Sequence, residues 1–124
     1  MNLFEIPEVD LKEYPIAFFA YIGDAVISLY SKLKYMNLKK PSKIEKQIKH
    51  MVSRSGQSES LEKIMEELTD EEKAIVKRAM NSKAATRHGN DRAYRNSTGL
   101  EALIGYLFLK RDFERLSYIL SKVN

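Results

Sequence analysis

The sequence contains no cysteine, which excludes disulfide bonds, thiolate metal ligands and a cysteine nucleophile. It has only three prolines, all within the first 41 residues, where we expect them to mark helix starts. No segment alternates apolar and polar residues as a half-buried strand does, and no repeat or low-complexity tract divides the chain. With 124 residues, 44% of them hydrophobic, the chain can bury one core. We therefore expect a single all-α domain, a helical bundle spanning residues 1–124.

A long uninterrupted apolar run is also missing. The most apolar stretch, Ile16 to Tyr30, is broken by Asp24 and is shorter than the roughly 18 to 20 residues that a bilayer requires. The amino-terminal residues include acids where a signal peptide would be apolar. These features predict a cytoplasmic protein with no membrane partner, in which this stretch forms a core or interface helix.

The charged residues are sorted into blocks along the chain. Residues 32–49 hold seven lysines against Glu45 alone, and residues 73–100 hold seven lysines and arginines against Asp91, whereas residues 59–72 are almost wholly acidic. The net charge is only +4, but the distribution of charge matters more to a polyanion than the sum. The sequence therefore offers a polyanion two basic surfaces.

Apolar spacing and capping signals predict the helices. Ser42 with Glu45, and Thr69 with Glu72, have the spacing of capping boxes, and Asp112 can cap the last helix. Residues 82–91 mix basic, polar and glycine residues without periodicity, which predicts a mobile basic loop. The expected helices cover residues 15–36, a segment opening at Pro41–Ser42, and residues 57–67, 70–81, 92–110 and 112–123.

Asp24 lies inside an apolar helix, and none of its same-face neighbours can neutralise it. A carboxylate removed from water needs a cation, several donors or a metal, so its partner must come from elsewhere in the fold. A structural aspartate bound by another helix is one explanation, and a functional one is the other. Gly23 beside it indicates close approach by another group, which tight helix packing explains equally well.

Glu101 repeats the problem in a second apolar helix, beside the small residues Gly99, Ala102 and Gly105. It could be a solvated glutamate that reaches the surface. Two such acids on different helices favour another explanation, because hard cations such as Mg²⁺ use one or two carboxylates, with water and substrate phosphate as further ligands.

The sequence does not fit other common kinds of active site. His50 and His88 show no metal-ligand spacing. We interpret His50 as a surface or interhelical residue and His88 as a loop residue that contacts phosphate. The serines of residues 53–60 lack a glycine elbow, and no glycine-rich phosphate loop is present.

Two segments carry a family resemblance. Residues 20–26, Ala-Tyr-Ile-Gly-Asp-Ala-Val, resemble the signature helix of ribonuclease III domains, and residues 98–105, Thr-Gly-Leu-Glu-Ala-Leu-Ile-Gly, resemble the later helix with their essential glutamate. Further similarity runs through residues 49–53, 81–83 and 94–99, so it covers about residues 16–120. Within the superfamily the chain is most similar to mini-ribonuclease III, the catalytic domain without a double-stranded-RNA-binding domain.

The resemblance implies the homodimeric helical bundle of the ribonuclease III endonuclease domain. It implies that Asp24 and Glu101 are the catalytic, metal-binding pair of an endoribonuclease that cleaves double-stranded RNA and leaves 5′-phosphate ends. The cofactor it implies is Mg²⁺, with Mn²⁺ as a substitute. It also implies maturation of the large-subunit (23S) ribosomal RNA precursor, and leaves open a ribosomal protein as a partner.

The chain departs from full-length ribonuclease III where further acids are expected. Ala17 and Ala20 replace acids before the aspartate, Thr98 replaces one before the glutamate, and another acidic position falls near Pro41. Only two protein carboxylates are left, so water and RNA phosphate would supply the other ligands.

Because A-form RNA hides its base edges in a deep, narrow groove, a small helical enzyme is expected to recognise shape, phosphates and 2′-hydroxyls. The basic loop and its flanks are the expected RNA-binding surface, although these charges could simply be solvated, and Arg95 could brace the helix of Glu101. The predicted RNA contacts are Asn81, Lys83, Arg87, His88, Arg92, Arg95 and Asn96.

The helix from Ile16 to Tyr30 is apolar nearly all round, more than the core of a small bundle requires. The candidate dimer contacts are Phe18, Phe19, Tyr21, Ile22 and Val26, each of which could equally be internal core. From the residues alone an alternative function also stands: a non-catalytic helical adaptor that binds structured RNA and uses Asp24 and Glu101 only as buried polar residues.

Overall fold

The computed structural model describes residues 5–87, 89 and 91–124, and these residues form helices joined by short connections. One short 3-10 segment, η1 (Leu11–Glu13), precedes the first α-helix, and two more, η2 (Met36–Leu38) and η3 (Met65–Glu67), lie between α-helices. The α-helices are α1 (Ile16–Lys34), α2 (Pro41–Ile48), α3 (Arg54–Ile64), α4 (Asp70–Met80), α5 (Lys83–Thr86), α6 (Arg92–Leu109) and α7 (Phe113–Ser121). No strand occurs among these residues, so the all-α prediction is confirmed.

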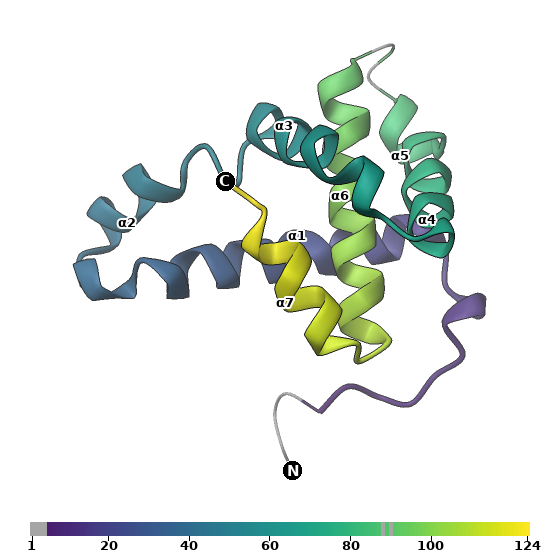
Figure 1. The fold of residues 1–124 in the computed structure, drawn as a ribbon, viewed down its shortest axis with the longest axis horizontal. Coiled ribbons are helices and arrows are strands. Elements are labelled where there is room, and N and C mark those ends of the chain that lie inside the picture. Colours follow the sequence, from purple (N-terminus) through teal and green to yellow (C-terminus); the bar gives the residue numbers. More distant parts are fainter. Residues whose placement is uncertain (1–4, 88, 90) are drawn as a thin grey trace.

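Helix α6 is the centre of the molecule, and α1, α3, α4 and α7 all pack on it (Figure 1). Apart from Glu101, its middle turns are apolar, and Leu100, Leu103 and Ile104 lose nearly all contact with water. A helix that is hydrophobic all round is stable only when other elements cover it on every side. This explains why the other long helices are arranged around α6.

The most extensive helix contact is the crossing of α1 and α6, where the two backbones touch. A Cβ atom added at Gly23 of α1 would lie 1.7 Å from the Glu101 carbonyl oxygen of α6. One added at Gly105 would lie 1.8 Å from the carbonyl oxygen of Phe19 and 2.9 Å from the Gly23 nitrogen. No side chain fits at either position, so these two glycines fix how closely the helices approach and at which residues they cross.

The capping box predicted at Thr69 and Glu72 is confirmed: each side chain accepts a hydrogen bond from the other's backbone N–H. Glu72 is buried and also binds the Arg115 guanidinium of α7, with N···O distances of 2.8 Å. The hydrogen bond from Arg115 holds the pKa of Glu72 below its usual value. The cap predicted at Asp112 is confirmed as well.

Two local predictions are wrong. Ser42 does not cap α2; the helix begins at Pro41 with Lys40 as the N-cap residue and no side-chain cap bond. Proline fits the first helical position because its ring sets φ and its missing N–H is not needed there. Residues 82–91 are not all loop, because Ser82 caps the short helix α5 through the Ala85 backbone N–H.

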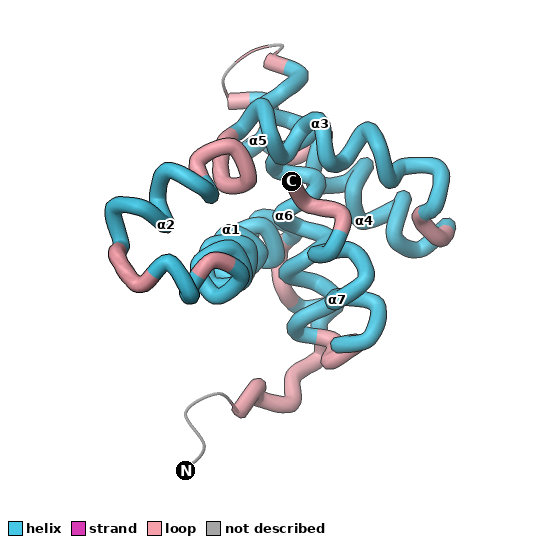
Figure 2. The backbone as a smooth tube through the Cα atoms, turned by 60° about the vertical axis from the view of Figure 1, so that its left-hand side comes forward, coloured by secondary structure: helices cyan, strands magenta, loops and turns pink. Residues whose placement is uncertain are grey.

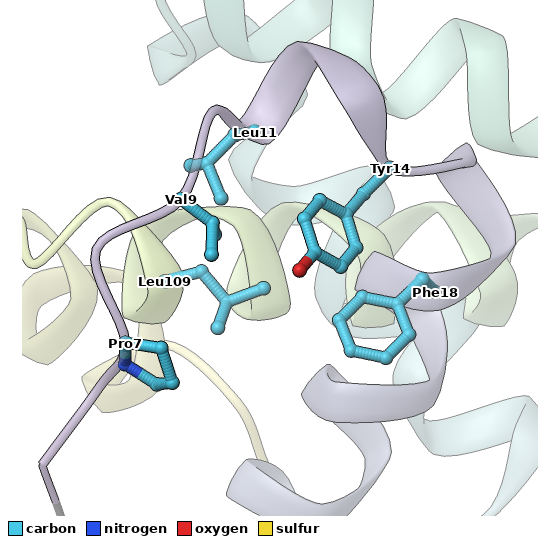
Figure 3. A pocket seen from close by; sticks show the side chains of 6 residues that line it. All are labelled: Pro7, Val9, Leu11, Tyr14, Phe18 and Leu109. Atoms are coloured by element: carbon cyan, nitrogen blue, oxygen red, sulfur yellow. The ribbon is translucent and has the colours of Figure 1, made fainter.

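The segment before α1 folds back over the bundle. Pro7, Val9, Leu11 and Tyr14 lie against Phe18 of α1 and Leu109 of α6, around an apolar pocket of about 90 Å³ (Figure 3). Apart from the Tyr14 hydroxyl, the side chains that line this pocket are hydrocarbon. It therefore serves packing rather than acid–base or metal chemistry.

The carboxyl-terminal half of α1 and the whole of α2 project from the bundle (Figures 1 and 2). By length and composition alone, α1 could cross a membrane. That is weak evidence, because core helices pass the same test, and the crossing with α6 already explains the apolar residues on one side of α1. Its other side carries the exposed residues Tyr21, Leu29 and Leu33.

Candidate active site

Asp24 and Glu101 lie together at the crossing of α1 and α6. Asp24 directly follows Gly23, and Gly23 packs on the Glu101 backbone. This close approach brings the two side chains into hydrogen-bond contact with each other. Asp24 is exposed and Glu101 is mostly buried, so the pair lies at the surface with one carboxyl group set back into the protein.

Burial and the neighbouring Asp24 change the ionisation of Glu101. Burial, followed by the hydrogen bond and the negative charge of Asp24, raises the pKa of Glu101 from 4.5 to about 8. At neutral pH and without a cation, Glu101 therefore keeps its proton. Two carboxyl groups held this close destabilise each other when both are ionised, so the arrangement needs a proton or a positive charge between them.

Among the described residues, no group of three or more histidines and carboxylates could hold a metal ion. The two acids still suit a hard divalent cation, because their oxygens are adjacent, one is open to solvent, and Mg²⁺ commonly binds through one or two carboxylates. Thr98 stands where a further acid is expected, and its buried hydroxyl donates to the Tyr94 carbonyl. The remaining ligands must come from water and substrate.

The predicted RNA contacts fall into two groups. Asn81, Lys83, Arg87 and Arg92 are exposed, and Arg92 has only a loose pair with Glu62 at 3.8 Å. These four residues remain available to a phosphate backbone. His88 lies outside the described residues.

Arg95 and Asn96 have internal partners. Arg95 donates from Nε to the Met80 carbonyl and from a terminal nitrogen to Asn81 Oδ1, both at 2.9 Å, so it braces α6 against the end of α4. Asn96 is 3% exposed and donates to Ser58 Oγ at 3.0 Å. The polar surface of α3 buries it, so Asn96 is a core residue rather than an RNA contact.

The candidate dimer residues also separate. Phe19 is 2% exposed and packs edge-on against Tyr106 inside the chain, so it belongs to the core. Phe18, Ile22 and Val26 are half-buried. Tyr21 is 75% exposed, which leaves it accessible to another chain.

Sequence reasoning missed three residues: Leu29 and Leu33 on the exposed side of α1, and Arg54 at the start of α3. Leu29 and Leu33 of α1 are more than half exposed, and four-residue spacing from Tyr21 through Ala25 could have identified them. Arg54 was also overlooked: it binds Asp91 at 2.9 Å and lies over the Tyr94 ring at 4.6 Å. It thereby ties the start of α3 to the start of α6.

The acid pair predicts a stability effect. Between pH 4.5 and about 8 the folded chain holds a proton on Glu101 that the unfolded chain releases, so the free energy of unfolding falls as pH rises through this window. Asp24→Asn removes the neighbouring charge. In EDTA, urea denaturation should show this variant more stable than wild type by on the order of 1 kcal/mol at pH 8.5, and the difference should shrink toward pH 5.

Glu45→Gln, which removes an exposed carboxylate on α2, is the matched control and should show no such trend. An Asp24→Asn effect that does not vary with pH would mean that the two carboxyl groups do not interact.

The chain was compared with known proteins. Residues 17–112 match the model of the ribonuclease III domain family. The chain is 40% identical over 114 residues to Mini-ribonuclease 3 of Kosmotoga olearia, covering 90% of this chain and 79% of the relative. It is 41% identical over 111 residues to Mini-ribonuclease 3 of Staphylococcus aureus, covering 84% and 82%.

A crystal structure of a Fusobacterium nucleatum protein superposes with a TM-score of 0.80 at 30% identity, covering 92% of this chain and 94% of the other. The family match spans most of the chain and includes both acids of the pair. The family match identifies the protein as an enzyme, which excludes the alternative of a non-catalytic RNA-binding adaptor. The chain therefore belongs to the ribonuclease III family of endoribonucleases, in its mini-ribonuclease III branch.

Proposed function

We propose that the protein is a Mg²⁺-dependent endoribonuclease that cleaves double-stranded RNA, with Asp24 and Glu101 as the catalytic, metal-binding pair. The observation that carries the proposal is the contact between these two carboxyl groups at the helix crossing. Glu101, which holds a proton in the absence of metal, can exchange that proton for Mg²⁺, for which Mn²⁺ is a natural substitute.

A divalent ion held by the pair supplies positive charge that stabilises the phosphate oxygens during hydrolysis. Asp24, which is exposed, and Glu101, which is half-buried on the core helix α6, are the residues that would hold this cation. Water adds to phosphorus and the bond to the 3′ oxygen breaks, so the products carry 5′-phosphate and 3′-hydroxyl ends.

The proposed RNA surface consists of the exposed residues Lys83, Arg87 and Arg92, with Asn81 as a neutral donor. His88, which lies outside the described residues, is a further sequence prediction for this surface. Lysine and arginine contacts to phosphate position a duplex without reading its sequence. The Arg54–Asp91 pair and the bonds of Arg95 fix both ends of the segment that carries these residues. Because both ends of this segment are fixed, we expect it to contact the RNA in one defined position.

The proposed active form is a homodimer. Tyr21, Ala25, Leu29 and Leu33 recur every four residues and form one exposed, mostly apolar stripe along α1. An apolar stripe of this kind on a projecting helix is expected to be covered, and the same stripe on a second copy is complementary to it in a two-fold dimer. Each copy would then supply one acid pair, and one pair could act on each strand of the duplex.

The resemblance to mini-ribonuclease III supports a biological substrate as well: the precursor of the large-subunit (23S) ribosomal RNA. That substrate places the enzyme in the cytoplasm, near the assembling ribosome, where a ribosomal protein could present the RNA. This assignment rests on the family alone, whereas the chemistry also rests on the acid pair.

The cleavage test uses duplex RNA with Mg²⁺, with Mn²⁺ and with EDTA. Wild type should cut with either metal and not in EDTA. Asp24→Asn and Glu101→Gln should each lower kcat by at least about a hundredfold, because the cation contributes several kcal/mol of charge stabilisation.

Glu45→Gln serves as the carboxylate control and should cleave at the wild-type rate. Wild-type activity that persists in EDTA, or full activity in both acid variants, would refute the proposed site.

The dimer test compares Leu33→Asp with Phe113→Asp. Both remove a large apolar side chain that is about half exposed, but only Leu33 lies in the α1 stripe. Sedimentation equilibrium should give wild type and Phe113→Asp twice the 14.4 kDa chain mass, and Leu33→Asp the mass of one chain. A wild-type monomer, or a Leu33→Asp dimer of undiminished affinity, would exclude this interface.

A further inference from the structure

We propose that α2 and the residues just before it form a second contact surface for duplex RNA, which binds phosphates outside the cleaved segment. We call residues 37–49 the basic arm; its lysines are Lys39, Lys40, Lys43, Lys46 and Lys49. The inference rests on the proposed function, since it assigns the arm to the same substrate. It concerns a surface that the active-site residues do not include.

The arm is built to present its lysines to solvent. Ile48 is fully buried and Ile44 is half-buried against the core, so this side of α2 anchors the helix. Lys43, Lys46 and Lys49 lie away from that apolar side and are exposed. The arm projects from the bundle (Figures 1 and 2), so a long duplex can approach it.

The lysines of the arm are not neutralised by the rest of the described chain. None of them forms an ion pair within 4.0 Å, whereas the arginines Arg54, Arg92 and Arg115 each do. Glu45 is the arm's single acid. Mutually repelling cations without partners lower stability, and a polyanion relieves that repulsion.

Residues 32–49, which include the basic arm, make the net charge of the protein positive. The whole chain holds 21 lysines and arginines against 17 acids, a net charge of +4. Without the seven lysines and one acid of residues 32–49, the other residues hold 14 against 16, a net charge of −2. Residues 32–49 are therefore one of two strongly basic segments that can attract RNA, beside residues 73–100.

A groove gives the surface its shape. Lys46, Lys49 and His50 line an open groove of about 430 Å³ together with Ser53 and Ser55 at the start of α3. Its walls are basic and polar, without a large apolar side chain, which favours a phosphate backbone over a peptide with apolar anchors. Helix α1 ends at Lys34, shortly before the basic arm begins. Lys34 is ten residues, or about 15 Å of helix, from Asp24, so one duplex can reach both the arm and the acid pair.

The test replaces Lys43, Lys46 and Lys49 together by glutamine, which keeps helix propensity. The matched control replaces the exposed Lys12, Lys63 and Lys122 by glutamine and changes net charge equally. Binding to a long RNA duplex is measured in EDTA as a function of salt. The arm variant should reduce the slope of log K against log salt by about two to three, and the control should keep a slope close to wild type.

Steady-state cleavage in Mg²⁺ should show the arm variant with a raised KM and unchanged kcat, because the acid pair is intact. Equal slopes for wild type and arm variant, with cleavage intact, would overturn the arm proposal alone. A wild type that neither binds nor cuts duplex RNA would overturn the proposed function and the arm with it. An equal defect on single-stranded RNA of the same length would overturn the assignment to duplex.

Discussion

The contact between the backbones of α1 and α6 determines the rest of this structure. Gly23 and Gly105 let the two helices touch where any side chain would collide with a carbonyl group. Because Asp24 follows one glycine and Glu101 is the residue on which that glycine packs, the same contact joins the two acids. The fold and the site therefore depend on one crossing, and a change in its register would separate the carboxyl groups.

The acid pair is a local conflict in an otherwise consistent fold. Elsewhere the buried charge is balanced, as in the pair of Glu72 with Arg115. At the crossing, two carboxyl groups meet, and burial raises the pKa of Glu101 to about 8. Sites that lower stability in the resting protein are common where a ligand is needed to complete them. A divalent cation bound by the pair, as proposed, would resolve this conflict.

Charge and apolar surface are distributed around the crossing in a way that suits a duplex substrate. The α1 stripe that starts near the acid pair ends close to the basic arm, so a dimer formed on this stripe would carry two arms outward from its centre. The segment of Lys83 and Arg87 is held at its base by Arg54. In the proposed function, a small chain would thus present several phosphate-binding surfaces beside a site of only two carboxylates.

Much of this was predictable from the sequence. Helical periodicity and the Thr69–Glu72 signal predicted the all-α fold, and two acids in apolar helices predicted a shared site. The sequence does not reveal the partners of buried polar groups. It predicts that Asn96 donates to phosphate, whereas in the fold Asn96 donates to Ser58. Phe19 and Leu33 are both apolar residues of α1, and only the packing of α6 shows that one is core and the other exposed.

The most direct test of the shared site is the binding of Mn²⁺ to the protein without RNA, followed by electron paramagnetic resonance. The account predicts one ion bound per chain in wild type, and loss of that binding in both Asp24→Asn and Glu101→Gln, because each acid supplies part of a single site. Wild-type Mn²⁺ affinity in either variant would show that the two carboxyl groups do not hold one ion together.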